Sequence, residues 1–326
     1  MEPRYKPYAL ALVSGVIYAA FNLIMFRSGN SNGGSYLPAA GFIVMSNAFL
    51  IFVPFSIGWF SIPAQSAEAG WITWVFLPWL PVALSDVLLL LMGREGLICI
   101  VFAIPITFFF ASVGGVAAGL YHRRIRKRLA STLCIAILPF VIAFAESFHT
   151  APRQIRPVET SLVIHAPVST IWQNIASVRA IAPAELRPTW AHKIGFPLPI
   201  AATLDRESIG GVRKASFEGG VLFTETITDW QPDHTIAFSI RADTPSIPST
   251  TLDEHVTIGG EYFDVLDGRY TIEPQQDGSI RLRLVSQERL STDFNWYAGL
   301  WSDAVMRSLQ QSILEVIQHR CESARD

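Results

Sequence analysis

The sequence has little charge and little cysteine, and each shortage excludes a class of protein. Only 16% of its 326 residues are charged, against about 25% in an average soluble protein. The three cysteines are Cys99, Cys134 and Cys321. They contain no CxxC pair, and their odd number does not match the paired cysteines of a disulfide-rich domain. A disulfide scaffold is therefore excluded, and no zinc-ligand spacing is present. We expect no bound metal.

Motifs for covalent catalysis and nucleotide binding are also missing. The chain has no GxSxG, no reactive-cysteine context and no phosphate-binding glycine loop, so no cofactor is expected. Residues 1–150 carry nine Lys or Arg against five Asp or Glu, a net charge of +4, and residues 151–326 carry sixteen against twenty-two, a net charge of −6. The acidic half lacks the basic surface that nucleic acid binding needs.

Long apolar runs fill residues 1–150. A bilayer core of roughly 30 Å requires about 20 apolar residues in a helix, and five segments approach that length: residues 8–26, 37–60, 71–92, 97–120 and 129–145. Pro78, Pro81 and Asp86 interrupt the third segment, so whether it crosses fully is left open. A signal peptide is the alternative for the first segment, but further spans follow it. We expect a transmembrane anchor domain of about five spans.

The basic segment YHRRIRKR, residues 121–128, orients these spans. Basic residues in short loops stay on the cytoplasmic side of a membrane. Counting back over four spans places the basic N-terminus on the same side, and counting forward over one span places residues 147–326 on the other. We therefore expect a multi-pass protein whose C-terminal domain is periplasmic or extracellular.

Residues 151–326 have the pattern of a soluble α+β domain. A strand at 159–165 precedes a helix with Ile171, Trp172 and Ile175 at helical spacing. Further strands are expected at 211–217, 221–230, 235–241, 261–266, 269–273 and 279–290, with Asp267-Gly268 as either a turn or a bulge. Residues 297–317 predict a long terminal helix, because apolar residues recur there every four positions.

The opening SLVIHAPVSTIWQNIAS, the central VRKASFEGGVLFTETITDWQPDHTIAFSI and the closing YAGLWSDAVMRSLQQSILEVIQ resemble the SRPBCC superfamily of START-like, polyketide cyclase/dehydrase and pollen-allergen-like proteins. This resemblance covers about residues 155–323. It implies a helix-grip domain, a curved antiparallel sheet around a long C-terminal helix, with a central cavity for lipids, polyketides or aromatic ligands. The stretch MGREGLICIVFAIP resembles the anchor of a bacterial subgroup, which implies the bacterial inner membrane.

Alternation along the strands predicts which residues face inward. On strand 221–230 the inward set contains Phe223, Glu225 and Ile227, because the alternate set is rich in threonine. Either these inward residues pack a plain core or they line a ligand site. The candidate ligand-binding residues are Trp172, Phe217, Phe223, Glu225, Phe238, Leu284, Tyr297, Trp301 and Val305.

Glu225 is the one carboxylate in that inward set. A three-residue loop at 218–220 places Arg213 opposite it, and a two-residue turn places Lys214 there instead. The hydrophobic pattern favours the three-residue loop, because it turns Ala215 and Phe217 inward. Arg213 and Glu225 are the catalytic candidates, as an acid–base unit, and a structural ion pair is the alternative.

Two irregular stretches are candidate gates over the site. Residues 180–200 contain four prolines, and residues 243–260 are too long for an ordinary hairpin. His255 lies in the second stretch and is assigned to the gate, not to a metal site, since no second histidine lies at ligand spacing.

Three functions remain open from the sequence. The first is membrane-anchored binding of a hydrophobic ligand, a lipid or a polyketide-like molecule, without catalysis. The second is a cyclase or dehydratase that uses Glu225 and Arg213. The third is an envelope interaction or sensor module whose cavity is filled by its own side chains.

Overall fold

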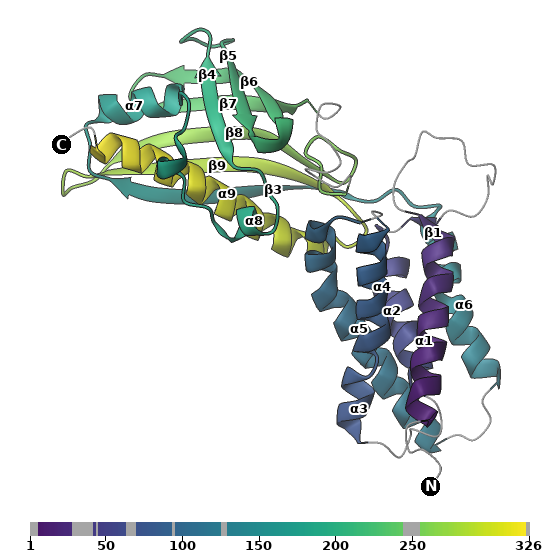
Figure 1. Cartoon of the computed structure of the whole chain (residues 1–326). Helices are drawn as coiled ribbons and strands as arrows, with labels where there is room; N and C mark the ends of the chain where they lie inside the picture. Colours follow the sequence, from purple (N-terminus) through teal and green to yellow (C-terminus); the bar gives the residue numbers. More distant parts are fainter. Residues whose placement is uncertain are drawn as a thin grey trace. The chain divides into compact units, whose positions relative to one another are not determined.

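A computed structural model describes residues 6–27, 42–43, 45–62, 70–92, 95–124, 129–243 and 255–323. The chain divides into two compact units, Met1–Ala151 and Pro152–Asp326. Each unit has its own elements (Figure 1) and is described by itself.

The N-terminal unit is helical. Its elements, in order, are α1 (Lys6–Met25), β1 (Phe26–Arg27), β2 (Phe42–Ile43), a π-helical turn (Ala48–Phe52), α2 (Val53–Phe60), α3 (Trp71–Phe76), α4 (Trp79–Leu91), α5 (Leu97–Arg124) and α6 (Leu129–Glu146). Small residues allow close packing on α5: a Cβ at Gly114 would collide with the backbone of Phe55, and one at Gly119 with the ring of Trp74. Such contacts between helices need glycine on at least one side.

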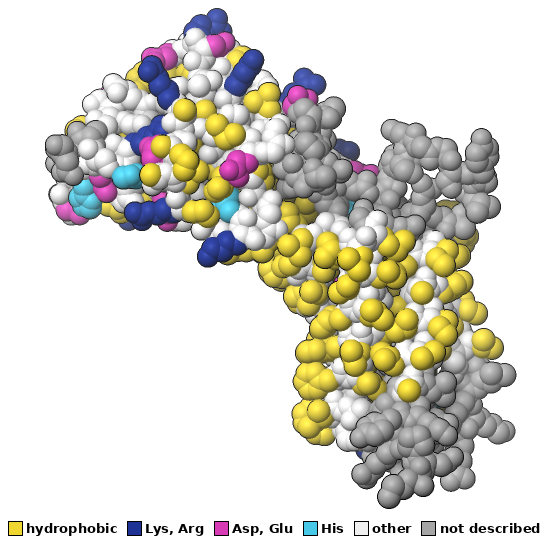
Figure 2. Space-filling model, viewed as in Figure 1, with side chains coloured by type: hydrophobic (Ala, Val, Ile, Leu, Met, Phe, Trp, Pro, Cys, Tyr) yellow, Lys and Arg dark blue, Asp and Glu magenta, His cyan; other side chains and the backbone are white. Residues whose placement is uncertain are grey.

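Two helices of this unit are long and apolar enough to cross a membrane, Trp71–Leu91 and Leu97–Arg124. The prediction of about five spans is therefore wrong for the described residues, in which two helices reach that length. The other three predicted segments contain shorter apolar helices: Leu12–Met25, Ala48–Phe60 and Thr132–Glu146. The second of these includes the π-helical turn at Ala48–Phe52. Apolar side chains cover much of the visible surface of α1, α3, α4 and α5 (Figure 2).

The C-terminal unit contains seven strands and one long helix. The strands are β3 (Arg153–Ile164), β4 (Pro199–Leu204), β5 (Val212–Phe217), β6 (Leu222–Gln231), β7 (Thr235–Ala242), β8 (Phe263–Pro274) and β9 (Ile280–Ser291). The α-helices are α7 (Val168–Ala176), α8 (Trp190–Lys193) and α9 (Asn295–Ser323), with 3-10 turns at Pro183–Glu185 and Glu218–Gly220.

The strands form one antiparallel sheet in the order β3-β9-β8-β7-β6-β5-β4. The helix α9 lies along one face of this sheet (Figure 1). Its side chains also cover the open edge at β3, since Gln310 and Gln318 donate hydrogen bonds to the carbonyls of Val158 and Val163. A curved sheet closed by a long terminal helix is the helix-grip arrangement, and this prediction is confirmed.

Three elements differ from the predicted ones. β3 begins at Arg153, six residues early, because all of it pairs with β9. β4 lies in the proline-rich stretch and was not predicted; as an edge strand it tolerates proline. The two predicted strands at 261–266 and 269–273 form the single strand β8, with a bulge between Val265 and Asp267, so Asp267-Gly268 is not a turn.

Candidate functional site

The face of the sheet beneath α9 is apolar with a few buried polar groups. Alternate residues of β6, Phe223, Glu225 and Ile227, are buried as the alternation predicts. On β9 the alternate residues Leu282, Leu284, Ser286, Glu288 and Leu290 are all buried, and of these only Leu284 was a predicted site residue. Alternate side chains of a strand point to the same face of the sheet, so these residues line one surface.

Six of the nine candidate ligand-binding residues are buried: Trp172, Phe223, Glu225, Phe238, Leu284 and Val305. Phe217, Tyr297 and Trp301 are half-buried. Two of the candidates, Phe217 and Phe223, pack edge to face with ring centroids 5.2 Å apart. Trp172 packs in the same way against Trp230, which was not a candidate, with centroids 4.9 Å apart. Trp172, Phe238 and Leu284 belong to one hydrophobic core, so this part of the face packs against α7 and the C-terminal half of α9.

Arg213 lies opposite Glu225 on adjacent strands. The three-residue loop at 218–220 is confirmed, and it closes because Gly219 and Gly220 adopt φ of 68° and 81°, values that favour glycine. Arg213 Nε donates to Glu225 Oε2 over 2.5 Å, and both side chains are almost fully buried. The pair is therefore a buried, charge-assisted hydrogen bond.

A second bond ties this pair to a helix end. Arg213 Nη1 donates to the carbonyl of Ile175 over 2.6 Å, and Ile175 lies in the last turn of α7, where backbone carbonyls have no partner within the helix. The guanidinium also stacks over the ring of Phe238, with Cζ 4.2 Å from the centroid. Through these contacts Arg213 links α7 to the sheet, which is a structural role.

Tyr270 lies near the same arginine, with its ring centroid 5.9 Å from Arg213 Cζ. Burial raises the pKa of Tyr270 to about 12, an effect that the charge of Arg213 opposes and that of Glu225 reinforces. The phenol therefore keeps its proton at neutral pH and cannot serve as a base there.

Glu288 was not predicted as a site residue. It is fully buried on β9, and the alternation through Leu282, Leu284 and Ser286 was the signal that would have found it. Ser302 Oγ on α9 donates to Glu288 Oε1 over 2.5 Å, and Arg156 Nε lies 4.0 Å from the same oxygen. Burial raises the pKa of Glu288 to about 7; Asp303 adds to this rise, and Ser302 and Arg156 oppose it.

A further buried polar group is Gln310, on the side of α9 that faces the sheet. Its amide donates to Ser286 Oγ over 3.1 Å and to the carbonyl of Val158 over 3.2 Å, and its oxygen accepts from Thr160 Oγ1 over 2.7 Å. Every polar atom of this amide thus has a partner, which is the usual condition for a buried amide.

The structure describes all of the first candidate gate, residues 180–200, and only part of the second, residues 243–260. Within residues 180–200, Glu185 forms a 2.6 Å ion pair with Arg320 of α9, and Arg320 also donates to the carbonyls of Arg179 and Ala180. Of the other stretch, residues 244–254 lie outside the described residues. His255, assigned to the gate, lies 5.7 Å from Tyr262 between ring centroids.

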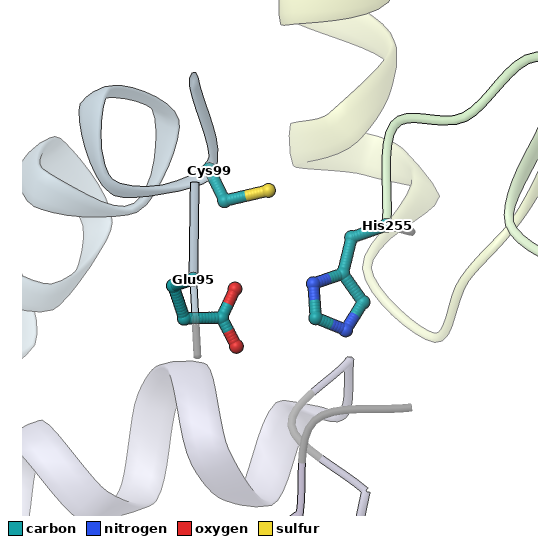
Figure 3. Close-up of side chains that lie close together, drawn as sticks. All are labelled: Glu95, Cys99 and His255. Atoms are coloured by element: carbon teal, nitrogen blue, oxygen red, sulfur yellow. The ribbon is translucent and has the colours of Figure 1, made fainter. Parts of the chain in front are cut away.

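Glu95, just before α5, lies near Cys99 in the first turn of that helix (Figure 3). His255, which Figure 3 also draws, belongs to the other unit. Glu95 and Cys99 do not make a zinc site by themselves, because such a site has three or four protein ligands.

One open groove of about 220 Å³ lies on the C-terminal unit. Its lining is polar and consists of Arg187 and five residues of α9: Glu315, Gln318, His319, Glu322 and Ser323. None of these is a candidate ligand-binding residue, and their charge suits water better than a hydrophobic ligand.

No family model and no curated protein matches the sequence. Solved structures match about half of the chain. A START superfamily protein from Mycobacterium smegmatis is 11% identical over 52% of this chain and 98% of its own, with a TM-score of 0.34. A norcoclaurine synthase point mutant from Thalictrum, in complex with a transition state analogue, is 10% identical over 54% and 99%, with a TM-score of 0.33.

DynU16, from the dynemicin biosynthetic locus, is 12% identical over 52% of this chain, with a TM-score of 0.32, and the match spans 48% of its own length. Similarities at this level carry no argument about function. The fold follows instead from the strand order and from α9. On that evidence, residues 152–326 form a helix-grip domain of the kind found in the SRPBCC superfamily.

Proposed function

We propose that the C-terminal unit binds a hydrophobic small molecule, a lipid or a polyketide-like compound, between α9 and the sheet, without catalysis. The observation that carries this proposal is the composition of the covered face. It is apolar and aromatic, with isolated polar groups at Arg213, Glu225, Ser286 and Glu288. Small-molecule sites have this composition, because apolar walls supply affinity and a few polar groups fix orientation.

Catalysis by Arg213 and Glu225 is not part of the proposal. An acid–base pair must reach the substrate proton within hydrogen-bond distance. Here the guanidinium is occupied by Glu225, by the carbonyl of Ile175 and by the ring of Phe238. The contacts of this arginine favour the structural interpretation of the pair.

In this proposal residues 1–150 are a membrane anchor in the bacterial inner membrane. Support comes from the two helices of spanning length, Trp71–Leu91 and Leu97–Arg124, and from three shorter apolar helices. Many of their large side chains are exposed, including Ile24, Leu91, Phe109 and Phe144. Contiguous apolar surface of this kind is typical of contact with lipid or with a partner. An anchor would keep a binder of hydrophobic molecules beside a membrane that supplies them.

Two tryptophans of α9 provide a matched test. Trp301 is half-buried and a candidate ligand contact, whereas Trp296 is 60% exposed on the same helix. The full-length protein in amphipol is titrated with 11-(dansylamino)undecanoic acid, and dansyl fluorescence reports binding. We expect Trp301→Ala to weaken binding about tenfold, since losing a buried aromatic contact costs roughly 1–2 kcal/mol, and Trp296→Ala to leave it unchanged. Equal effects of the two substitutions, or no binding by the unmodified protein, would contradict the proposal.

A further inference from the structure

Glu288 occupies the face beneath α9 at a point where polar groups from three elements meet. In register, it lies between Arg156 on β3 and Val265 on β8. Ser302 of α9 lies above it and donates to Oε1. The glutamate side chain is fully buried, so water does not solvate its charge.

One oxygen of this carboxylate accepts no hydrogen bond when the group is ionised, although the protonated group is hydrogen-bonded to Asp303. Glu288 Oε2 is buried and accepts no hydrogen bond from any residue that the structure describes. An unsatisfied buried acceptor costs about 1–3 kcal/mol, and more if it is charged. Native proteins keep few such atoms, and each one needs an explanation. Here a proton between Glu288 and Asp303 is one explanation, and a bound cation is another.

The charges around Glu288 do not balance. Arg156 donates two hydrogen bonds to Asp303, over 3.1 and 2.7 Å, and lies farther from Glu288, at 4.0 Å. Arg307 lies 3.9 Å from Asp303 but is 59% exposed, so its charge is screened by solvent. Glu288 is fully buried, whereas Asp303 and Arg156 are 18% and 26% exposed. These three groups comprise one cation and two carboxylates. Either a proton or a second cation must neutralise the surplus negative charge.

We propose that Glu288 and Ser302 form the polar end of the ligand site and that this end takes the protonated primary amine of a hydrophobic ligand. This inference rests on the proposed function and deepens it. A primary ammonium brings the missing positive charge and an N–H donor for Oε2. A hydroxyl would leave the surplus charge in place, and a quaternary ammonium has no N–H to donate. A calcium or magnesium ion would need six or more oxygen ligands, which this group does not offer.

Without a ligand, a proton on Glu288 neutralises the group, and the proximity of Asp303 stabilises that protonated form. The amine and the proton then compete for one carboxylate. Amine binding must therefore release a proton at neutral pH, whereas binding of a neutral ligand must not. This linkage separates the proposed role from a merely structural one.

Three probes with the same ten-carbon chain test the inference on the full-length protein in amphipol. Decylamine has both charge and N–H donors, decyltrimethylammonium has charge alone, and decanol has a donor alone. Titration calorimetry in buffers of different ionisation enthalpy measures affinity and proton release together. The variant is Glu288→Gln, and the matched control is Glu159→Gln, whose side chain is 54% exposed.

We expect decylamine to bind about tenfold more tightly than the other two probes at pH 8, because a hydrogen bond to a charged group is worth about that factor or more. Its affinity should fall about tenfold from pH 8 to pH 6 as Glu288 takes up its proton. Glu288→Gln should abolish both differences, and Glu159→Gln should preserve them.

Equal affinities of the three probes for the unmodified protein would overturn the inference and leave the proposed function standing. An amine preference that persists in a folded Glu288→Gln variant would do the same. If none of the probes binds the unmodified protein, the proposed function itself fails. Since the comparison of probes on the unmodified protein needs no variant, the inference stays testable even if Glu288→Gln does not fold.

Discussion

Arg213 connects three parts of the helix-grip domain through one side chain. It bonds Glu225 on the neighbouring strand, the carbonyl of Ile175 in α7 and the ring of Phe238. Its position opposite Glu225 could be predicted from the sequence, because the length of the loop at 218–220 fixes the register of the hairpin. The bond to Ile175 could not, since it depends on where α7 packs.

Removing Arg213 alone should destabilise the domain by about 3–5 kcal/mol, because Arg213→Met leaves the Glu225 charge buried without a partner. The double variant Arg213→Met/Glu225→Leu should recover much of that loss. Hydrogen exchange of β5 and β6 peptides in the full-length protein measures the free energy of opening. A single variant as stable as the unmodified protein would show that the pair carries no structural role.

Glu288 should make the domain less stable as pH rises. Burial raises its pKa to about 7 in the folded state, against about 4.3 in an unfolded chain. The folded state therefore binds more protons between these values, and stability is full below about pH 4.5 and is lost as pH rises through 7. Arg156 on β3 and Asp303 and Ser302 on α9 are the polar groups that face it.

The expected loss is at most about 4 kcal/mol, since the two pKa values differ by about 2.7 units and each unit corresponds to about 1.4 kcal/mol. Glu288→Gln should remove it, so that the free energies of opening of the two proteins converge at pH 5 and differ most at pH 8. The measurement is hydrogen exchange of β9 peptides at both values, corrected for the intrinsic rate. A pH profile unchanged by Glu288→Gln would contradict the raised pKa.

At the scale of elements, β8 depends on one glycine. A Cβ at Gly268 would lie 2.6 Å from the ring of Phe238 on β7, and Phe238 is Gly268's partner in the register. The glycine therefore makes room for the ring that also stacks on Arg213. The sequence alone left this dipeptide open between a turn and a bulge, because both use glycine.

Gly268→Ala should cost about 1–3 kcal/mol by overpacking against that ring. The double variant Gly268→Ala/Phe238→Leu should be less destabilised than the sum of its two single variants, because leucine is smaller and leaves space for the new methyl group. A double-mutant cycle on the opening free energy of β7 and β8 tests this. Strict additivity would mean that the two residues do not share the space.

The face of α9 shows a limit of prediction from spacing. A repeat of exactly four residues turns about 40° per step on a helix of 3.6 residues per turn, so Tyr297, Trp301, Val305, Leu309 and Ile313 cannot all face the sheet. Val305 is buried and the other four are half-buried, while Gln310, Ser312 and Leu314 are buried between them. The polar members were missed because a hydrophobic stripe does not indicate them.

At the scale of the whole molecule, the order of elements in residues 152–326 was predictable and the membrane half less so. Alternation predicted most strands because every other residue packs under α9. In the N-terminal unit, length and hydropathy indicated five spans, whereas two described helices meet the length for spanning. Composition alone does not indicate where a helix within an apolar segment begins, such as the one at Ala48–Phe60.

The orientation predicted from the sequence rests on five crossings, whereas two described helices have spanning length. A reporter fusion tests that prediction: if five segments cross, the basic loop at 121–128 is cytoplasmic and the C-terminus is periplasmic. Alkaline phosphatase fused after residue 326 should then be active, and the same enzyme fused within residues 121–128 should be inactive. The reverse pattern, or activity at both positions, would show that one of the five segments does not cross.

The central claim is that the helix-grip domain holds one hydrophobic molecule. Native mass spectrometry of the full-length protein, released from detergent under mild activation, measures this directly. We predict one reproducible extra mass per chain that dissociates as a lipid or polyketide-like compound and that is lost in Trp301→Ala but kept in Trp296→Ala. A single unliganded mass under the mildest activation, in protein that also binds none of the added hydrophobic probes, would contradict the claim.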